Sequence, residues 1–142
     1  MKKKYAAILI LIFALPGCKK QTTSEENIVN FLTTGTWRII AHTYRNAFGS
    51  TDLYATSVDC TKDDYFRFVK DGTEEINEGP SKCNSSNPQS RVSQWKFLNQ
   101  YNNKIEIDGW DYSFHKLDDN KFEIITWFTD PYAPQTDITF NR

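Results

Sequence analysis

The sequence has little of what catalysis usually needs, because its 142 residues include only two histidines. His42 lies on the face of a strand-like segment opposite Trp37 and Ile39, and His115 alternates with Phe114, so we expect both to point outward. Two outward histidines on separate strands do not form a base with an orienting partner. Gly-rich phosphate loops and nucleophile elbows are also missing. We therefore predict no catalytic residue, no cofactor and no enzyme activity.

The sequence also lacks the patterns that indicate metal-binding or nucleic-acid-binding sites. Asp63-Asp64 and Asp118-Asp119 lack the spaced ligands of a calcium loop, and Asp is a common turn residue. The formal net charge is -1, with no basic stripe along the chain. The sequence predicts no metal site and no nucleic-acid partner.

The N-terminus has the pattern of an export signal. Lys2, Lys3 and Lys4 precede an apolar run over 5–15 that is too short to cross a bilayer with ease. Leu15-Pro16-Gly17-Cys18 resembles the lipobox of bacterial lipoproteins, in which the cysteine becomes the lipidated first residue. This resemblance implies a signal peptide over 1–17 and lipidation of Cys18. The alternative is a plain signal peptide with an incidental cysteine.

A polar segment over 18–27 follows and is expected to act as a tether. Lys19 stands where an Asp would retain well-studied lipoproteins in the inner membrane, so the resemblance implies an envelope protein anchored in the outer membrane. Its periplasmic or surface side stays open. Removal of 1–17 leaves 125 residues, which suits one domain over 28–142, and the loss of three lysines lowers the net charge from -1 to -4.

The remaining cysteines, Cys60 and Cys83, are expected to form one disulfide in an exported chain. Asp71-Gly72 between strand-like runs predicts a hairpin that brings them to one end. A two-residue turn places Cys60 opposite Cys83, whereas a three-residue Lys-Asp-Gly loop with a bulge places Phe66 opposite Ile76. Both registers leave the sulfur atoms within bridging reach.

The rest of the chain alternates short strands with turns. Ser24 is expected to cap a helix ending near 32, and longer loops are expected over 45–63, 79–90 and 129–135. The predicted strands are 36–44, 64–70, 73–78, 91–98, 104–108, 110–116, 121–128 and 136–141. Eight sequential antiparallel strands favour an all-β, up-and-down barrel, because closure removes exposed edges. A β-sandwich is the competing arrangement.

Aromatic residues make up 15% of the chain, and most are expected inside the barrel. Tyr65 and Trp127 fall on the outer face. The inward aromatics are Trp37, Phe66, Phe68, Trp95, Phe97, Trp110, Tyr112, Phe114, Phe122, Phe128 and Phe140. An eight-stranded interior is filled by side chains or holds one small ligand, and so many rings favour a filled interior.

Gly35-Thr36-Trp37, at the start of the first strand, resembles the opening motif of lipocalins and fatty-acid-binding proteins. The resemblance implies that Trp37 closes the bottom of a barrel and that a late arginine, here Arg142, packs over it. Over residues 33–142 the chain also resembles the lipocalin-like lipoproteins of Bacteroidota. That likeness rests on F-V-K-D-G-T at 68–73, Glu78-Gly79, Lys82-Cys83 and Trp95-Lys96-Phe97.

Strand order places the longer loops together at the top end, where a rigid scaffold usually carries function. We expect Phe48, Leu53, Tyr54 and Tyr132 to ring an opening, with Trp110 at its wall. The favoured function is binding of a small apolar or amphipathic ligand. A cavity larger than about 300 Å³ would support this function. The alternative is a protein-binding module, inhibitor-like or structural, with a filled barrel.

Overall fold

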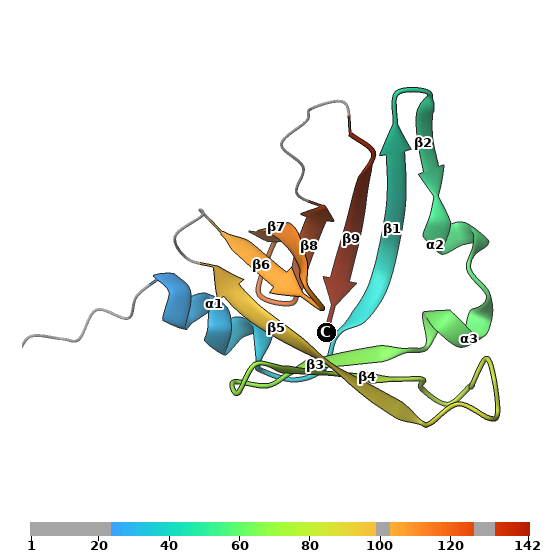
Figure 1. Ribbon diagram of the computed structural model, residues 1–142, viewed down its shortest axis with the longest axis horizontal. Helices are drawn as coiled ribbons and strands as arrows, with labels where there is room; N and C mark the ends of the chain where they lie inside the picture. Colours follow the sequence, from blue (N-terminus) through green and yellow to red (C-terminus); the bar gives the residue numbers. More distant parts are fainter. Residues whose placement is uncertain (1–23, 99–102, 127–132) are drawn as a thin grey trace, which may run out of the picture.

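The computed structural model describes residues 24–98, 103–126 and 133–142, and within these residues the protein is all-β (Figure 1). Helix α1 (Ser24–Leu32) comes before the first strand. Two single-turn helices, α2 (Leu53–Thr56) and α3 (Asp59–Lys62), lie between the second and third strands of the chain. The strands are β1 (Arg38–Asn46), β2 (Gly49–Asp52), β3 (Tyr65–Phe68), β4 (Thr73–Asn77), β5 (Ser90–Leu98), β6 (Lys104–Ile107), β7 (Trp110–Lys116), β8 (Lys121–Thr126) and β9 (Gln135–Asn141).

These strands form one antiparallel sheet in the order β2-β1-β9-β8-β7-β6-β5-β4-β3. All neighbours are consecutive in the chain except β1 and β9, whose pairing brings the first and last long strands side by side (Figure 1). The sheet is not closed, since β2 and β3 are its edges. Trp37 and Phe66 nevertheless form an antiparallel bridge, with both backbone N–H···O distances at 2.8 Å, so the start of β1 lies against β3.

The predicted all-β class is confirmed, but the count of eight strands is wrong. Within the described residues each predicted strand is present, and β2 is an additional strand inside the expected loop 45–63. Its sequence, Gly-Ser-Thr-Asp, has no apolar residue and all four positions are exposed. A period-two pattern of apolar residues, which is the main signal for a strand, could not reveal it.

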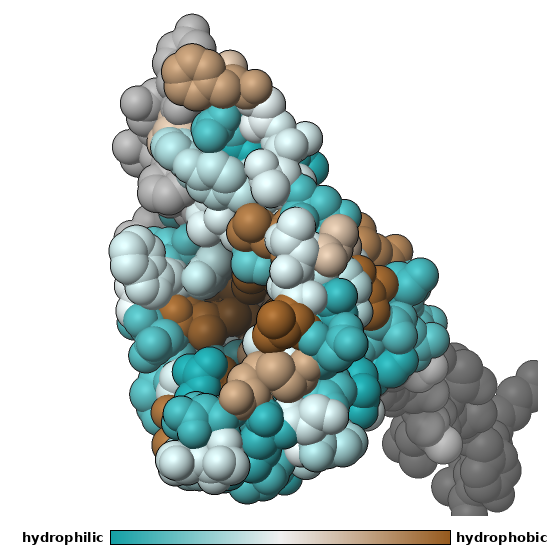
Figure 2. All heavy atoms as spheres, turned by 90° about the vertical axis from the view of Figure 1, so that its right-hand side faces the viewer, coloured by the Kyte–Doolittle hydropathy of each residue, from teal (hydrophilic) through white to brown (hydrophobic). Residues whose placement is uncertain are grey.

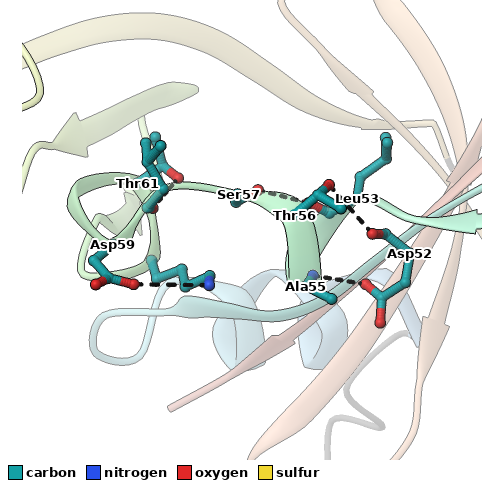
Figure 3. A network of polar contacts seen from close by, with 9 residues as sticks. Asp52, Leu53, Ala55, Thr56, Ser57, Asp59 and Thr61 are labelled. Carbon is teal, nitrogen blue, oxygen red and sulfur yellow. Dashed lines mark hydrogen bonds and ion pairs between the residues drawn. The ribbon is translucent and has the colours of Figure 1, made fainter.

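The helices in the same segment are held by local polar contacts rather than by an apolar face (Figure 3). Asp52 caps α2 by accepting a hydrogen bond from the backbone N–H of Ala55 at 2.9 Å. The Ser57 hydroxyl donates to the Leu53 carbonyl at 2.7 Å, and the Thr61 hydroxyl donates to the Val58 carbonyl at 2.8 Å. Four-residue helices are too short to show helical periodicity, so the sequence did not reveal them.

The hairpin between β3 and β4 adopts the register of the bulged three-residue loop. Phe66 pairs with Ile76 and Phe68 with Glu74, which rules out the two-residue turn. Gly72 has φ +90°, a left-handed conformation in which glycine is favoured. Its N–H donates to the Val69 carbonyl, while the Asp71 carboxylate accepts from the N–H of Thr73.

The core lies between α1 and the concave side of the sheet and is dominated by aromatic rings. Trp37 is completely buried, with its ring centre 5.0 Å from that of Phe31 and 4.8 Å from that of Phe122. Its indole N–H donates to the Leu32 carbonyl at 2.8 Å, so the polar edge of the ring is satisfied by the end of α1. The other buried apolar residues are Leu32, Phe68, Ile76, Trp95, Ile105, Phe114, Phe122, Ile124 and Phe140.

Arg142 covers Trp37, as the resemblance implied. Its guanidinium lies 4.8 Å from the centre of the Trp37 ring and donates to the Thr34 carbonyl at 2.7 Å and to the Asp119 carbonyl. Gly35 has φ +92°, and a Cβ atom there would lie 3.4 Å from Cδ of Arg142. A side chain at residue 35 would therefore be strained by its backbone conformation.

The expectation that His42 points outward is wrong. The pairing of β1 with β9 shifts between Ile39 and Ala41, which leaves Ile40 as a bulged residue. One extra residue reverses the alternation beyond it. His42 therefore pairs with Ile138 on the inner face, and burial lowers the pKa of its imidazole, although Asp52 acts in the opposite direction. His115 is exposed, as predicted.

Candidate functional site

A cavity of about 210 Å³ lies on the inner side of the sheet, away from α1. Figure 2 shows the face of the molecule that is at the right in Figure 1, and this face is hollowed, with apolar atoms inside the hollow and both hydrophilic and apolar atoms around it. Strands from both halves of the sheet line the cavity. Its lining residues are Ile39, Phe66, Glu74, Ile76, Arg91, Ser93, Ile107, Asp108, Trp110, Tyr112, Ile124, Ile138 and Phe140.

Aromatic packing limits the depth of this cavity. Phe140 stacks on Phe122 with ring centres 4.6 Å apart, and Phe66 meets Phe140 edge-on at 5.4 Å. These contacts close the side toward α1. The volume lies below the range of about 300–1,000 Å³ that is usual for drug-sized ligands. The interior is therefore mostly filled, as the aromatic content predicted, and the remaining space suits only a small molecule.

Glu74 is the most deeply buried polar group of the cavity wall, with only 3% of its surface exposed. Its Oε2 accepts a hydrogen bond of 2.6 Å from the hydroxyl of Ser93, which lies opposite it on β5. Burial raises the pKa of the Glu74 carboxyl. The hydrogen bond from Ser93 and the charge of Arg91 oppose this shift, whereas the charge of Asp108 adds to it.

Tyr112 and Asp108 complete the polar part of the wall. Burial, reinforced by the negative charges of Glu74 and Asp108, raises the pKa of the Tyr112 phenol, which therefore stays protonated and able to donate a hydrogen bond at neutral pH. Asp108 has φ +51° in the tight turn before Trp110. The turn thus places a carboxylate and an indole side by side at the cavity.

A second pocket of about 140 Å³ adjoins the first, and Ile39 and Phe66 line both. It lies where α2 and α3 fill the space between β1 and β3. Its lining residues are Ile39, His42, Tyr54, Ser57, Thr61, Lys62, Asp64 and Phe66. Lys62 lies over the Tyr54 ring, with Nζ 5.6 Å from the ring centre, so this pocket is more polar than the first.

The residues predicted to bind a ligand lie at different places in the structure. Trp110 lines the larger cavity while 66% of its surface is exposed, so it lies at the rim as expected. Tyr54 lines the smaller pocket instead. Phe48 and Leu53 line neither of these two cavities: Phe48 is 99% exposed at the β1–β2 turn, and Leu53 is the first residue of α2. Tyr132 and Phe128 lie outside the described residues.

The predicted disulfide is present between Cys60 and Cys83, whose Cα atoms are 5.2 Å apart. It joins α3 to the segment between β4 and β5. Close by, the Asp63 carboxylate accepts from the N–H of Ser81 at 3.0 Å. A Cβ atom on Gly79, which has φ +61°, would lie 2.3 Å from the Asp63 carbonyl oxygen, so the two segments meet where only glycine fits.

Three carboxylates gather beside this junction. Burial raises the pKa of Asp64, and the charges of Glu78 and Asp63 raise it further, against the opposing charge of Arg91. Buried oxygen atoms of all three carboxylates have no hydrogen-bond partner within the described parts of the chain. In those same parts, no group of three or more His, Cys, Asp or Glu side chains is arranged to hold a metal ion.

A groove at the opposite end of the sheet has a larger volume, about 560 Å³, but fewer features of a binding site. It runs between the α1–β1 connection and the residues that follow β3. Its charged residues already have partners: Arg67 pairs with Glu75 at 2.5 Å, and Lys70 donates to Asn30 at 2.7 Å. The cavity beside Glu74 is therefore the stronger candidate.

Glu74, Ser93 and Arg91 were not among the residues that the sequence singled out. Strand β4 contains one apolar residue, Ile76, so alternation was hard to detect there. The register of the bulged hairpin gives the missing signal, because pairing Phe68 with Glu74 places Glu74 on the same face as the buried Phe68 and Ile76.

No protein-family model and no curated protein sequence matches this chain. Among the helices formed by residues 24–98, 103–126 and 133–142, none is both long and apolar enough to cross a membrane.

Proposed function

We propose that this protein is a lipid-anchored envelope lipoprotein that binds a small apolar or amphipathic ligand in the cavity beside Glu74. The observation that carries the proposal is the combination of an apolar wall with a few convergent polar groups, which is the usual composition of a ligand site. The isoleucines and Phe140 supply the wall. Glu74, Ser93 and Tyr112 supply the polar groups.

A lipocalin-like barrel is the fold that we propose for this function, in preference to a sandwich. The pairing of β1 with β9 and the bridge between Trp37 and Phe66 support it, because they bring both ends of the sheet toward each other. Helices α2 and α3 occupy the space that remains between β1 and β3. The cavity then corresponds to the mouth of the barrel, and α1 covers its other end (Figure 1).

The anchor is proposed from the resemblance of residues 15–18 to a lipobox, since Cys18 lies outside the described residues. Replacing Cys18 by serine should move the protein from the membrane pellet to the soluble envelope fraction, because lipid on this residue would be the main membrane attachment. Fractionation of the native host, followed by immunoblotting, measures this. Cys18→Ser protein that stays in the pellet would refute the lipid anchor.

Ligand binding should change the fluorescence of Trp110, which lies at the rim. Small aromatic and aliphatic alcohols are suitable probes, since the cavity volume is about 210 Å³. Ile107→Phe should weaken binding at least about tenfold by filling the cavity, at a cost of about 1–3 kcal/mol in stability. Ile40→Phe, on the exposed bulge, is the matched control and should bind normally.

A second function, protein binding, is favoured by the mostly filled interior, whose cavity of about 210 Å³ is smaller than a typical ligand site, and by exposed apolar side chains. Phe48 is 99% exposed and Val58 62% exposed, and Trp110 is exposed at the rim. If no small probe alters Trp110 fluorescence and native mass spectrometry of protein purified from its own host finds no bound ligand, ligand binding is refuted and this alternative takes its place.

A further inference from the structure

We propose that the ligand of this cavity is a small primary amine with an apolar body, whose ammonium group binds to Glu74. This inference rests on the proposed ligand-binding function and specifies its chemical class. Its basis is a buried carboxylate that faces the cavity and has no cationic partner at contact distance among the residues that the structure describes.

Glu74 is placed to receive a cation. It is almost fully buried, and its described hydrogen bond comes from the neutral hydroxyl of Ser93. Among the ion pairs of the described residues, none involves Glu74. A buried carboxylate without a counter-charge is costly, and a ligand ammonium would supply that charge together with a charge-assisted hydrogen bond.

The charges around the cavity also favour a cation over an anion. Glu74 and Asp108 face one guanidinium, that of Arg91. Arg91 also acts on Asp64, which lines the adjoining pocket beside Glu78 and Asp63. Lys62 also lines that pocket, but carboxylates outnumber cations among the described residues here. An anionic ligand at Glu74 would meet repulsion from Asp108 as well.

The rest of the cavity suits an apolar body. Ile76, Ile107, Ile124 and Ile138 line it together with Phe66 and Phe140. Trp110 adds an aromatic side chain at the rim. A short chain carrying one aromatic ring would place its ring among the isoleucines and its nitrogen at Glu74.

Three probes of nearly equal shape test the inference by isothermal titration calorimetry on the mature chain: 2-phenylethylamine, 2-phenylethanol and 3-phenylpropanoate. The amine should bind about tenfold more tightly than the alcohol, and the anion most weakly. Glu74→Gln should reduce amine affinity to that of the alcohol and leave alcohol affinity unchanged. Glu75→Gln, at the next residue on β4, whose side chain is partly exposed and paired with Arg67, should change neither affinity by more than about twofold.

Glu74→Gln is expected to fold. Burial raises the pKa of Glu74 above its unfolded value, so the ionised form destabilises the native state as the pH rises through that pKa, and glutamine removes this cost. Glutamine can also accept the hydrogen bond from Ser93.

The pH dependence of the wild-type protein gives a second measurement that needs no Glu74 variant. Amine affinity should fall as the pH is lowered and Glu74 gains a proton, while alcohol affinity stays constant. The charged and titratable groups facing Glu74 are Arg91, Asp108 and Tyr112. His42 lines the adjoining pocket, so the series is repeated with His42→Gln to remove its contribution.

The possible outcomes separate the two proposals. Equal or tighter binding of the alcohol or the anion in the wild-type protein would overturn the amine inference and leave ligand binding intact. Failure of all three probes to bind would overturn the amine inference, and ligand binding itself is overturned when native mass spectrometry also finds no bound ligand. Retention of the amine preference in Glu74→Gln would show that Glu74 is not the recognition group.

Discussion

Replacing Trp37 by alanine should lower the free energy of unfolding by about 3–5 kcal/mol, the usual range for truncation of a buried aromatic side chain. Trp37 is completely buried and packs against Phe31 and Phe122. It also donates to the last carbonyl of α1 and lies under Arg142. Its loss would open a cavity among these groups and leave the Leu32 carbonyl without its partner.

Chemical denaturation followed by circular dichroism measures the change. Trp110→Ala is the matched control, because Trp110 is mostly exposed and its loss should change stability by no more than about 1 kcal/mol. A loss below about 1 kcal/mol for Trp37→Ala would contradict its role in joining α1 to the sheet.

Removing the Cys60–Cys83 disulfide, by changing both cysteines to serine, should lower stability by about 3 kcal/mol. The two cysteines are 23 residues apart, and in the chain-entropy model a bridge closing a loop of this size restricts the unfolded chain by about that amount. Reduction of the wild-type protein should cause a similar loss. Amide hydrogen exchange should increase most in α2 and α3, which have no buried residue.

Thiol titration of the unfolded, unreduced protein checks the bridge directly, and neither Cys60 nor Cys83 should react. Two reactive thiols would contradict the disulfide. If the double serine variant were as stable as the wild type, the contacts of Asp63 with Ser81 and of Gly79 with Asp63 would be sufficient to hold this junction.

The sequence predicted the all-β fold because apolar alternation is strong in the strands that form the core. Trp37, Trp95, Phe114, Phe122 and Phe140 were all expected inside, and all are buried. The end of the chain could be placed over Trp37 only through the resemblance to lipocalins, since no local signal ties Arg142 to residue 37.

The site was harder to predict because it depends on register and on irregular backbone. The bulge at Ile40 turns His42 inward, and the pattern of residues in β1 does not indicate a bulge. Glu74 becomes part of the cavity through its pairing with Phe68 and Ser93. Phe48 and Leu53 were placed at the opening from loop position alone, and that reasoning could not foresee the exposed β2 strand and the short α2 helix.

The most direct test of the proposed site is a methyl NMR titration of isotopically labelled isoleucines with 2-phenylethylamine and 2-phenylethanol. Ile39, Ile107, Ile124 and Ile138 line the cavity, Ile105 is buried elsewhere in the core, and Ile40 is exposed on the bulge. The account predicts that at least one probe shifts the cavity methyl signals saturably and leaves those of Ile40 and Ile105 in place. Shifts confined to Ile40, or no saturable shift with either probe, would contradict it.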